Sequence, residues 1–293
     1  MRMTTQIKKI LLLYKRSVYT NYFLNKKSSL RYKQDLLPPE NVERLRFIHA
    51  QHHMTLQRVE EYLKEVGLKY QKRSRGQKID YQKFDLVITL GGDGTFLEAA
   101  RNIKSQLVIG VNSSPESSVG RFCIANVKTF PLVIDQVIKN RFKVKLLQRL
   151  RLSGIPGING VNALNDILIA HQNPAAMSRY CLTVCGITEE QRSSGVWIAT
   201  ASGSTGAILS AGGEILRETS KNFQYFCREL YIGSQKIYRL KKGILKSNQK
   251  IQLTSLMREG RIFIDGSRTS WPFTFGQTIT VGHSFQPLKV IEL

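Results

Sequence analysis

The chain has 293 residues, of which 42% are apolar and 22% charged, which excludes a disordered chain and predicts one large globular domain or two ordinary ones. Its net charge of +23, from 44 Lys and Arg against 21 Asp and Glu, favours polyanionic partners such as nucleotides, polyphosphate, nucleic acid or acidic lipid headgroups. The basic residues are spread along the chain without a nucleic-acid-binding signature, and no apolar run approaches the length of a membrane span. We therefore expect no nucleic-acid partner and no membrane partner.

The N-terminal region has two interpretations. Nine Lys or Arg and no acidic residue precede Asp35, which is the composition of a transit peptide. The apolar run Ile10–Tyr14 between basic residues instead predicts the first strand of the fold. We favour the strand and expect a cytoplasmic protein, with organellar targeting left open.

The first half of the chain alternates between strand and helix patterns. After the first strand, a helical stripe places Leu56, Val59, Leu63 and Val66 three and four residues apart. Strands are then predicted at 84–90 and 107–112, with a helix from about Phe96 between them and a later helix with Phe130, Ile134, Val137 and Ile138 on one side. This alternation predicts a mainly parallel sheet with right-handed crossovers, as in Rossmann-like and phosphofructokinase-like folds.

The second half changes character near residue 145. Short β-rich segments separated by turn signals lie at 161–170, 178–187, 195–201, 250–256, 260–266 and 274–282. We therefore predict an α/β domain over 1–144 and a mainly β domain over 145–275. We predict that residues 276–293 form a separate C-terminal segment, which can pack back onto the first domain.

The cysteines and histidines give no sign of a metal site built from side chains alone. Four cysteines lack metal-type CxxC spacing, and we expect them to be reduced and in or near a core: Cys123, Cys181, Cys185 and Cys227. His52 and His53 lie in a polar helical stretch without a partner Cys or carboxylate, so we expect surface or interface histidines.

The segment FDLVITLGGDGTFLEAARNI at 84–103 carries the first candidate site. Ligands bind beyond the carboxyl ends of strands in open α/β sheets, which is where Gly91 and Gly92 fall. Glycines let a phosphate approach main-chain N–H groups, and the following helix directs its N-terminal partial positive charge to the same place. Asp93 would repel a phosphate, but it suits a carboxylate that accepts a proton from a hydroxyl or holds Mg²⁺. The alternative is a helix N-cap in an ordinary turn.

Three motifs in order resemble the NAD kinase family. GGDGT at 91–95 is similar to a signature that this family shares, with variation, with diacylglycerol kinases, sphingosine kinases and phosphofructokinases. ALNDILIA at 163–170 resembles the family's Asn-Glu/Asp motif, and ATASGSTGAILSAGG at 199–213 resembles TPTGSTAYSLSAGG. The resemblance extends to IFIDGS at 262–267 and implies an α/β domain followed by a mainly β, NAD kinase-like domain.

The departures from the family pattern resemble the plant NADH-kinase and mitochondrial NAD-kinase branch. GVNSSPESSVGRFC at 110–123 replaces the usual Gly-x-Leu-Gly-Phe-Leu segment after GVN, and Ser194-Gly195 replaces the usual Asp-Gly. Ala201 stands at the motif's Pro position and Ala207 at its Tyr position, which removes an aromatic platform for adenine. These differences leave the preference between NAD and NADH open.

The resemblance implies a role for each matched residue. Asp93 would act as base or orienting group for the 2′-hydroxyl of the adenosine ribose, in a loop for the ATP phosphates formed by Gly91, Gly92, Gly94 and Thr95. Asn165 would bond the adenine of NAD(H), and Asp166 would accept the ribose hydroxyls. The rest of the dinucleotide would be surrounded by Ser202, Gly203, Ser204, Thr205 and Ser210.

The implied reaction is ATP-dependent phosphorylation of NAD or NADH with Mg²⁺, in a homodimer or homotetramer, with polyphosphate as an open alternative donor. A lipid kinase that shares GGDGT, and a dinucleotide- or polyphosphate-binding protein without turnover, remain as alternatives. Asp265-Gly266 is either part of the site or a common hairpin turn.

Overall fold

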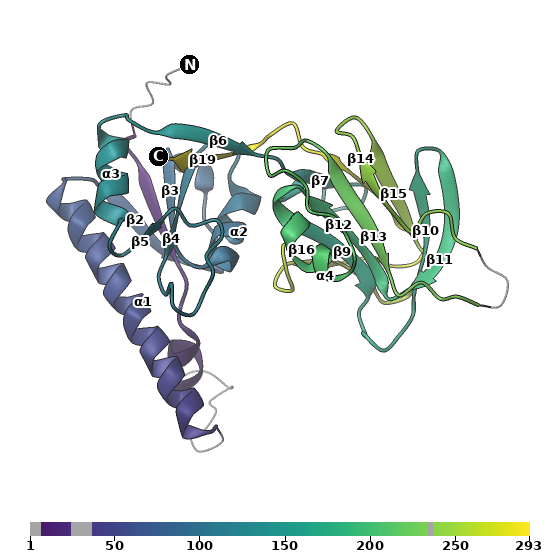
Figure 1. Cartoon of the computed structure of the whole chain (residues 1–293), viewed down its shortest axis with the longest axis horizontal. Helices are drawn as coiled ribbons and strands as arrows, with labels where there is room; N and C mark the ends of the chain where they lie inside the picture. Colours follow the sequence, from purple (N-terminus) through teal and green to yellow (C-terminus); the bar gives the residue numbers. More distant parts are fainter. Residues whose placement is uncertain (1–6, 25–36, 234–236) are drawn as a thin grey trace. The chain divides into compact units, whose positions relative to one another are not determined.

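The computed structural model describes residues 7–24, 37–233 and 237–293, which form two compact units (Figure 1). One unit is Met1–Lys145 together with Lys289–Leu293, and the other is Leu146–Leu288. The second unit extends past residue 275, where the sequence analysis ended it, because β18 (Thr278–His283) pairs with two strands inside that unit. The last strand, β19 (Leu288–Glu292), pairs with β4 in the sheet of the first unit.

The first unit is built on a sheet with strand order β2-β1-β3-β4-β19-β6, with β5 also paired to β4. The pairs β2/β1, β1/β3, β3/β4, β4/β19 and β4/β5 are all parallel. The bounds are β1 Ile10–Tyr14, β2 Tyr70–Ser74, β3 Leu86–Gly91, β4 Leu107–Asn112, β5 Ala125–Asn126 and β6 Lys143–Leu147. Every residue of β3 and β4 is buried, as expected of parallel strands covered on both faces.

Among the described residues of this unit, three α-helices cover the sheet: α1 (Pro39–Glu65), α2 (Asp93–Asn102) and α3 (Phe130–Ile138). The predicted stripe is confirmed at Leu56, Val59 and Leu63, which join α3 and alternate strand residues in one apolar cluster. The buried residues of α2 do not belong to that cluster, so α2 packs on the opposite face of the sheet. The prediction for Ile138 is wrong: it is 49% exposed, since α3 turns Val133 inward instead. Shorter turns lie at Thr20–Leu24 and Tyr81–Lys83.

The second unit contains two six-stranded antiparallel sheets, ordered β11-β10-β15-β18-β7-β8 and β14-β13-β12-β9-β16-β17. In the first sheet the remaining bounds are β7 Leu150–Ser153, β8 Val161–Ala163, β10 Ser178–Val184, β11 Ile187–Ser193 and β15 Lys250–Ser255. In the second they are β9 Asp166–His171, β12 Gly195–Thr200, β13 Phe223–Arg228, β14 Lys242–Leu245, β16 Gly260–Ile264 and β17 Ser270–Pro272. One apolar core takes side chains from both sheets, which therefore pack face to face.

The predicted fold class, an α/β unit and a mainly β unit, is confirmed. None of the four cysteines forms a disulfide, and Cys185 is exposed, contrary to the expected position in or near a core, while Cys181 is half-buried. The physical reason is the strand alternation of β10, which turns Tyr180, Leu182 and Val184 inward. No helix in the described part of the chain is long and apolar enough to cross a membrane.

Candidate active site

The GGDGT segment lies at the carboxyl end of β3, where the chain turns into α2. Gly91 is the last residue of β3, Gly92 is the N-cap of α2, and Asp93 is the first helical residue. A Cβ atom on Gly91 would overlap Thr95 Oγ1, and one on Gly92 would lie 2.7 Å from Ser118 Oγ. A side chain at either position would have to displace Thr95 or Ser118, which glycine avoids, and the first N–H groups of a helix are free to bind an anion.

Asp93 has one carboxylate oxygen in use and one available. Its Oδ1 accepts a hydrogen bond from the Phe122 main-chain N–H at 3.0 Å, which fixes the side chain. No described residue donates a hydrogen bond to its Oδ2. The N-cap alternative is wrong, because Gly92 occupies the cap. The half-buried carboxylate can accept a proton or bind a cation.

Two cations that the sequence analysis missed lie beside this loop. Lys15 directly follows β1 and Arg75 directly follows β2, so the parallel strands bring both to the edge that carries Asp93. Arg75 Nε contacts Glu98 Oε2 at 2.8 Å, and its Nη1 lies 3.3 Å from where a Cβ on Gly94 would be. Burial, and then the charge of Arg75, lower the pKa of Lys15. The sequence signal that could have found Lys15 and Arg75 is their position, because each is a basic residue directly after a strand of the parallel sheet.

A serine-rich loop, residues 113–118, follows β4 at the same edge. Ser113 Oγ lies 2.9 Å from His52 Nδ1, and Ser114 Oγ donates to Gln51 Oε1 at 2.5 Å. The prediction of a surface or interface histidine is wrong for His52, a residue of α1 that is buried against this loop within one chain. Burial, with a smaller effect from the charge of Lys15, lowers its pKa to about 4, so it is neutral at pH 7.

In the second unit, Asp265 holds the turn that carries Asn165 and Asp166. Its carboxylate accepts hydrogen bonds from the main-chain N–H groups of Leu164 at 3.0 Å, Asn165 at 2.7 Å and Asp166 at 3.4 Å. Asp265 has a φ of 50° and lies between the paired strands β16 and β17. The hairpin interpretation therefore applies, and the same carboxylate also holds the Asn165 turn in place.

Asn165 and Asp166 present two adjacent acceptors to which no residue in the described ranges donates a hydrogen bond. Asn165 Oδ1 is buried and has no hydrogen-bond partner among the described residues. Asp166 is 7% exposed, and burial together with the charge of Asp265 raises its pKa to about 7. A buried polar atom without a partner is unfavourable in the free protein, and a ligand donor would remove that penalty.

The SGSTG segment packs directly against this turn. Ser202–Thr205 forms a single 3₁₀ turn and Ala207–Ser210 forms the short helix α4. Gly203 approaches the Asn165 carbonyl so closely that a Cβ would overlap it, and its N–H donates to Thr200 Oγ1 at 2.9 Å. The hydroxyl of Ser204 is used internally, donating to Ala201 O at 2.7 Å.

The structure therefore groups some of the predicted dinucleotide residues and separates others. Asn165, Asp166, Asp265 and Gly203 are linked by the contacts above, and Ser202 is buried in the same turn. The side chains at the later positions are exposed: Thr205, Ala207 and Ser210.

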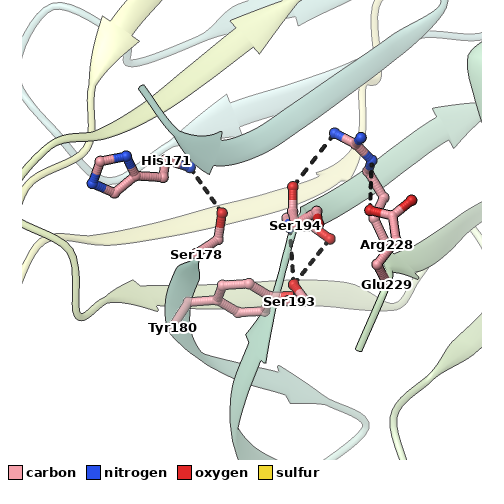
Figure 2. Close-up of polar contacts among 8 residues, drawn as sticks. His171, Ser178, Tyr180, Ser193, Ser194, Arg228 and Glu229 are labelled. Carbon is pink, nitrogen blue, oxygen red and sulfur yellow. Dashed lines mark hydrogen bonds and ion pairs between the residues drawn. The ribbon is translucent and has the colours of Figure 1, made fainter. Parts of the chain in front are cut away.

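The segment where Ser194-Gly195 replaces Asp-Gly is held by hydroxyl and main-chain contacts (Figure 2). Ser193 Oγ lies 2.8 Å from Tyr180 Oη and accepts from the Gly195 N–H at 2.9 Å. Arg228 Nη1 lies 3.4 Å from the Ser194 carbonyl oxygen. Arg228 on β13 therefore contacts the main chain at the residue that replaces the family's Asp.

Comparison with known proteins places these features in a family. The family described as the ATP-NAD kinase N-terminal domain matches residues 14–142. A probable NADH kinase from Oryza sativa subsp. japonica is 33% identical over 233 residues, covering 71% of this chain and 70% of that protein. The chain belongs to the NAD kinase family. An NADH kinase from Arabidopsis thaliana is 30% identical over 70% of this chain and 72% of its own length, which agrees with the resemblance to the plant branch.

Two solved structures of this family share the fold. An NAD kinase from Archaeoglobus fulgidus in complex with ATP has a TM-score of 0.67 at 21% identity, covering 97% of this chain and 93% of that one. A yeast NADH kinase complexed with NADH has a TM-score of 0.70 at 16% identity, covering 98% and 84%. At these identities, the two similarities show a shared fold and nothing further.

Proposed function

We propose that this protein transfers the γ-phosphoryl group of ATP to the 2′-hydroxyl of the adenosine ribose of NAD or NADH, giving NADP or NADPH. The observation that carries the proposal is the buried pair of acceptors at Asn165 and Asp166, in a chain of the NAD kinase family. Relatives named NADH kinase, and a yeast one complexed with NADH, support the choice of acceptor substrate.

The second unit supplies the dinucleotide contacts in this proposal. The Asn165 amide suits a base edge that offers both donors and acceptors, and its unpaired Oδ1 would accept from the exocyclic amine of adenine. The ionised Asp166 would accept ribose hydroxyls. Asp265 and Gly203 hold both residues in place through the main chain.

The first unit supplies the phosphate contacts. The glycines and the N-terminus of α2 leave N–H groups for the ATP phosphates, and Lys15 and Arg75 supply positive charge at the same edge. The archaeal family member in complex with ATP supports ATP as donor. Polyphosphate carries the same phosphoryl groups and is the alternative donor.

Mg²⁺ fits this arrangement as an ion that arrives with ATP. In the described ranges, no three His, Cys, Asp or Glu side chains are grouped to hold a metal. Kinase Mg²⁺ takes most of its ligands from the substrate phosphates and from water, so the ion does not need a dedicated cage of protein side chains. The bound ion would neutralise charge on the transferred phosphoryl group.

In this proposal Asp93 is the general base that accepts the proton of the attacking ribose hydroxyl. The ribose O2′ forms a bond to the γ-phosphorus as the bond to the bridging β-γ oxygen breaks, and ADP leaves with that electron pair. The hydroxyl proton passes to the Asp93 carboxylate, which the Phe122 N–H keeps oriented.

The test is steady-state phosphorylation with MgATP, comparing NAD and NADH on one preparation of the wild type and of Asp93→Asn. We expect kcat to fall by about 10²–10⁴ in the variant, with an unchanged melting temperature. Normal rates in Asp93→Asn would refute its role, and no turnover of either dinucleotide by the wild type would refute the function. Light scattering on the same sample tests the proposed homodimer or homotetramer.

A further inference from the structure

We propose that Ser118 contacts the phosphates of the nucleotide donor, and that His52 on helix α1 is the residue that positions it there. The inference rests on the proposed function and deepens it, because it concerns the donor side of the same site. It assigns a role to the serine-rich loop, which replaces a glycine- and leucine-containing segment in the family pattern.

Ser118 lies directly at the phosphate loop. Its Oγ is 2.7 Å from the position that a Cβ on Gly92 would occupy, so the hydroxyl stands over the N-cap of α2. The residue is half-buried, and no described residue forms a hydrogen bond with its hydroxyl. Arg75 and Lys15 give the edge a positive charge, and a hydroxyl there can donate to a phosphate oxygen.

Both ends of the loop are tied together. Asn112 Nδ2 donates to the Ser118 carbonyl oxygen at 2.8 Å, and the Ser114 N–H donates to Asn112 Oδ1 at 3.1 Å. Ser117 Oγ donates to Ser114 Oγ at 2.7 Å. Moving Ser113 and Ser114 would therefore move Ser118 as well.

Helix α1 holds the start of the loop through side chains on one face. His52 contacts Ser113 Oγ and Gln51 accepts from Ser114 Oγ. Thr55 Oγ1 donates to the Gln51 carbonyl oxygen at 2.8 Å and lies 3.3 Å from the Ser113 carbonyl oxygen. His52 and Ser114 are each 1% exposed and Ser113 is fully buried. Apolar packing would hold the loop with less directional restraint, whereas a satisfied buried polar cluster specifies one geometry.

The first experiment compares Ser118→Ala with Ser105→Ala, an exposed serine outside the loop, by steady-state kinetics with MgATP and NADH. We expect the KM for ATP to rise about tenfold in Ser118→Ala, as for a lost hydrogen bond to a charged group. The KM for NADH should stay within about twofold of the wild type, and Ser105→Ala should leave both unchanged. Equal changes in both KM values, or no change, would overturn the contact.

The second experiment tests positioning by His52. His52→Leu removes the contact with Ser113, whereas the amide of His52→Asn can replace Nδ1, and His53→Leu changes an exposed neighbour. We expect His52→Leu to raise the KM for ATP and to add little in a double variant with Ser118→Ala, and His52→Asn to restore most of the affinity. If His52→Leu does not fold, Ser113→Ala removes the same contact with a smaller change in volume. Full additivity, or no rescue by Asn, would overturn the positioning role.

Binding of a nonhydrolysable ATP analogue, measured by calorimetry on the wild type and Ser118→Ala, separates this inference from the proposed function. Weaker binding in the variant supports the Ser118 contact even if the wild type phosphorylates neither dinucleotide. Equal binding overturns the contact even if turnover is normal.

Discussion

Asp166→Asn should make the protein more stable at alkaline pH while weakening dinucleotide binding. Asp166 is buried, and no described residue donates a hydrogen bond to its carboxylate. The nearby charge of Asp265 adds to the cost of ionising it. Asparagine has nearly the same shape and carries no charge, so the variant removes this cost.

The magnitude follows from the pKa of Asp166, which rises from 3.8 to about 7 on folding. Because the folded state holds the proton more tightly, this contribution to stability is complete below pH 4 and is lost as pH rises through 7. A change of about three units corresponds to about 4 kcal/mol. The stability of Asp166→Asn relative to the wild type should therefore increase by up to about 4 kcal/mol between pH 4 and pH 8.

Urea unfolding at pH 5, 6, 7 and 8, followed by tryptophan fluorescence, measures this difference. Trp197 and Trp271, the two tryptophans of the chain, both lie in the second unit with Asp166. Glu259→Gln, an exposed carboxylate in that unit, is the matched control and should show no pH-dependent gain. A variant less stable than the wild type at pH 8, or a difference independent of pH, would refute the reasoning.

Two further substitutions probe the supports of each site. Glu98→Gln removes the charge that anchors Arg75 and should raise the KM for ATP about threefold to tenfold, whereas Glu60→Gln, which breaks an ion pair elsewhere in that unit, should not. Gly203→Ala places a methyl group against the Asn165 carbonyl and should destabilise the second unit by about 1–3 kcal/mol. It should also raise the KM for NAD(H), and unchanged values in urea unfolding and kinetics would contradict the close approach.

Local sequence patterns were sufficient to predict those strands and turns whose conformation depends mainly on neighbouring residues in the chain. The apolar runs at 107–112 and 10–14 predicted strands that the structure contains with the same bounds. The glycines after β3 predicted a turn into a helix, which begins at Asp93, three residues earlier than expected, because Gly92 caps it.

The supporting residues depended on contacts between distant segments. Asp265 bonds a turn about 100 residues earlier, and His52 contacts a serine 61 residues later. A histidine in a polar stretch of helix gives no local sign of burial, because the polar partner that makes burial tolerable lies on another element.

The sequence alone was enough to predict the alternation of strands and helices in the first unit, the mainly β character of the second unit and the family, because these depend on short motifs and local periodicity. The groups around the candidate site residues are visible only in three dimensions: Lys15 and Arg75 lie beside GGDGT, and Asp265 lies behind the Asn165 turn. Parallel strands bring residues that are far apart in sequence to one edge, and burial sets the pKa of Asp166. The shared strand edge and the burial of Asp166 both depend on residues that are close in space but distant in sequence, so a local sequence pattern cannot predict them.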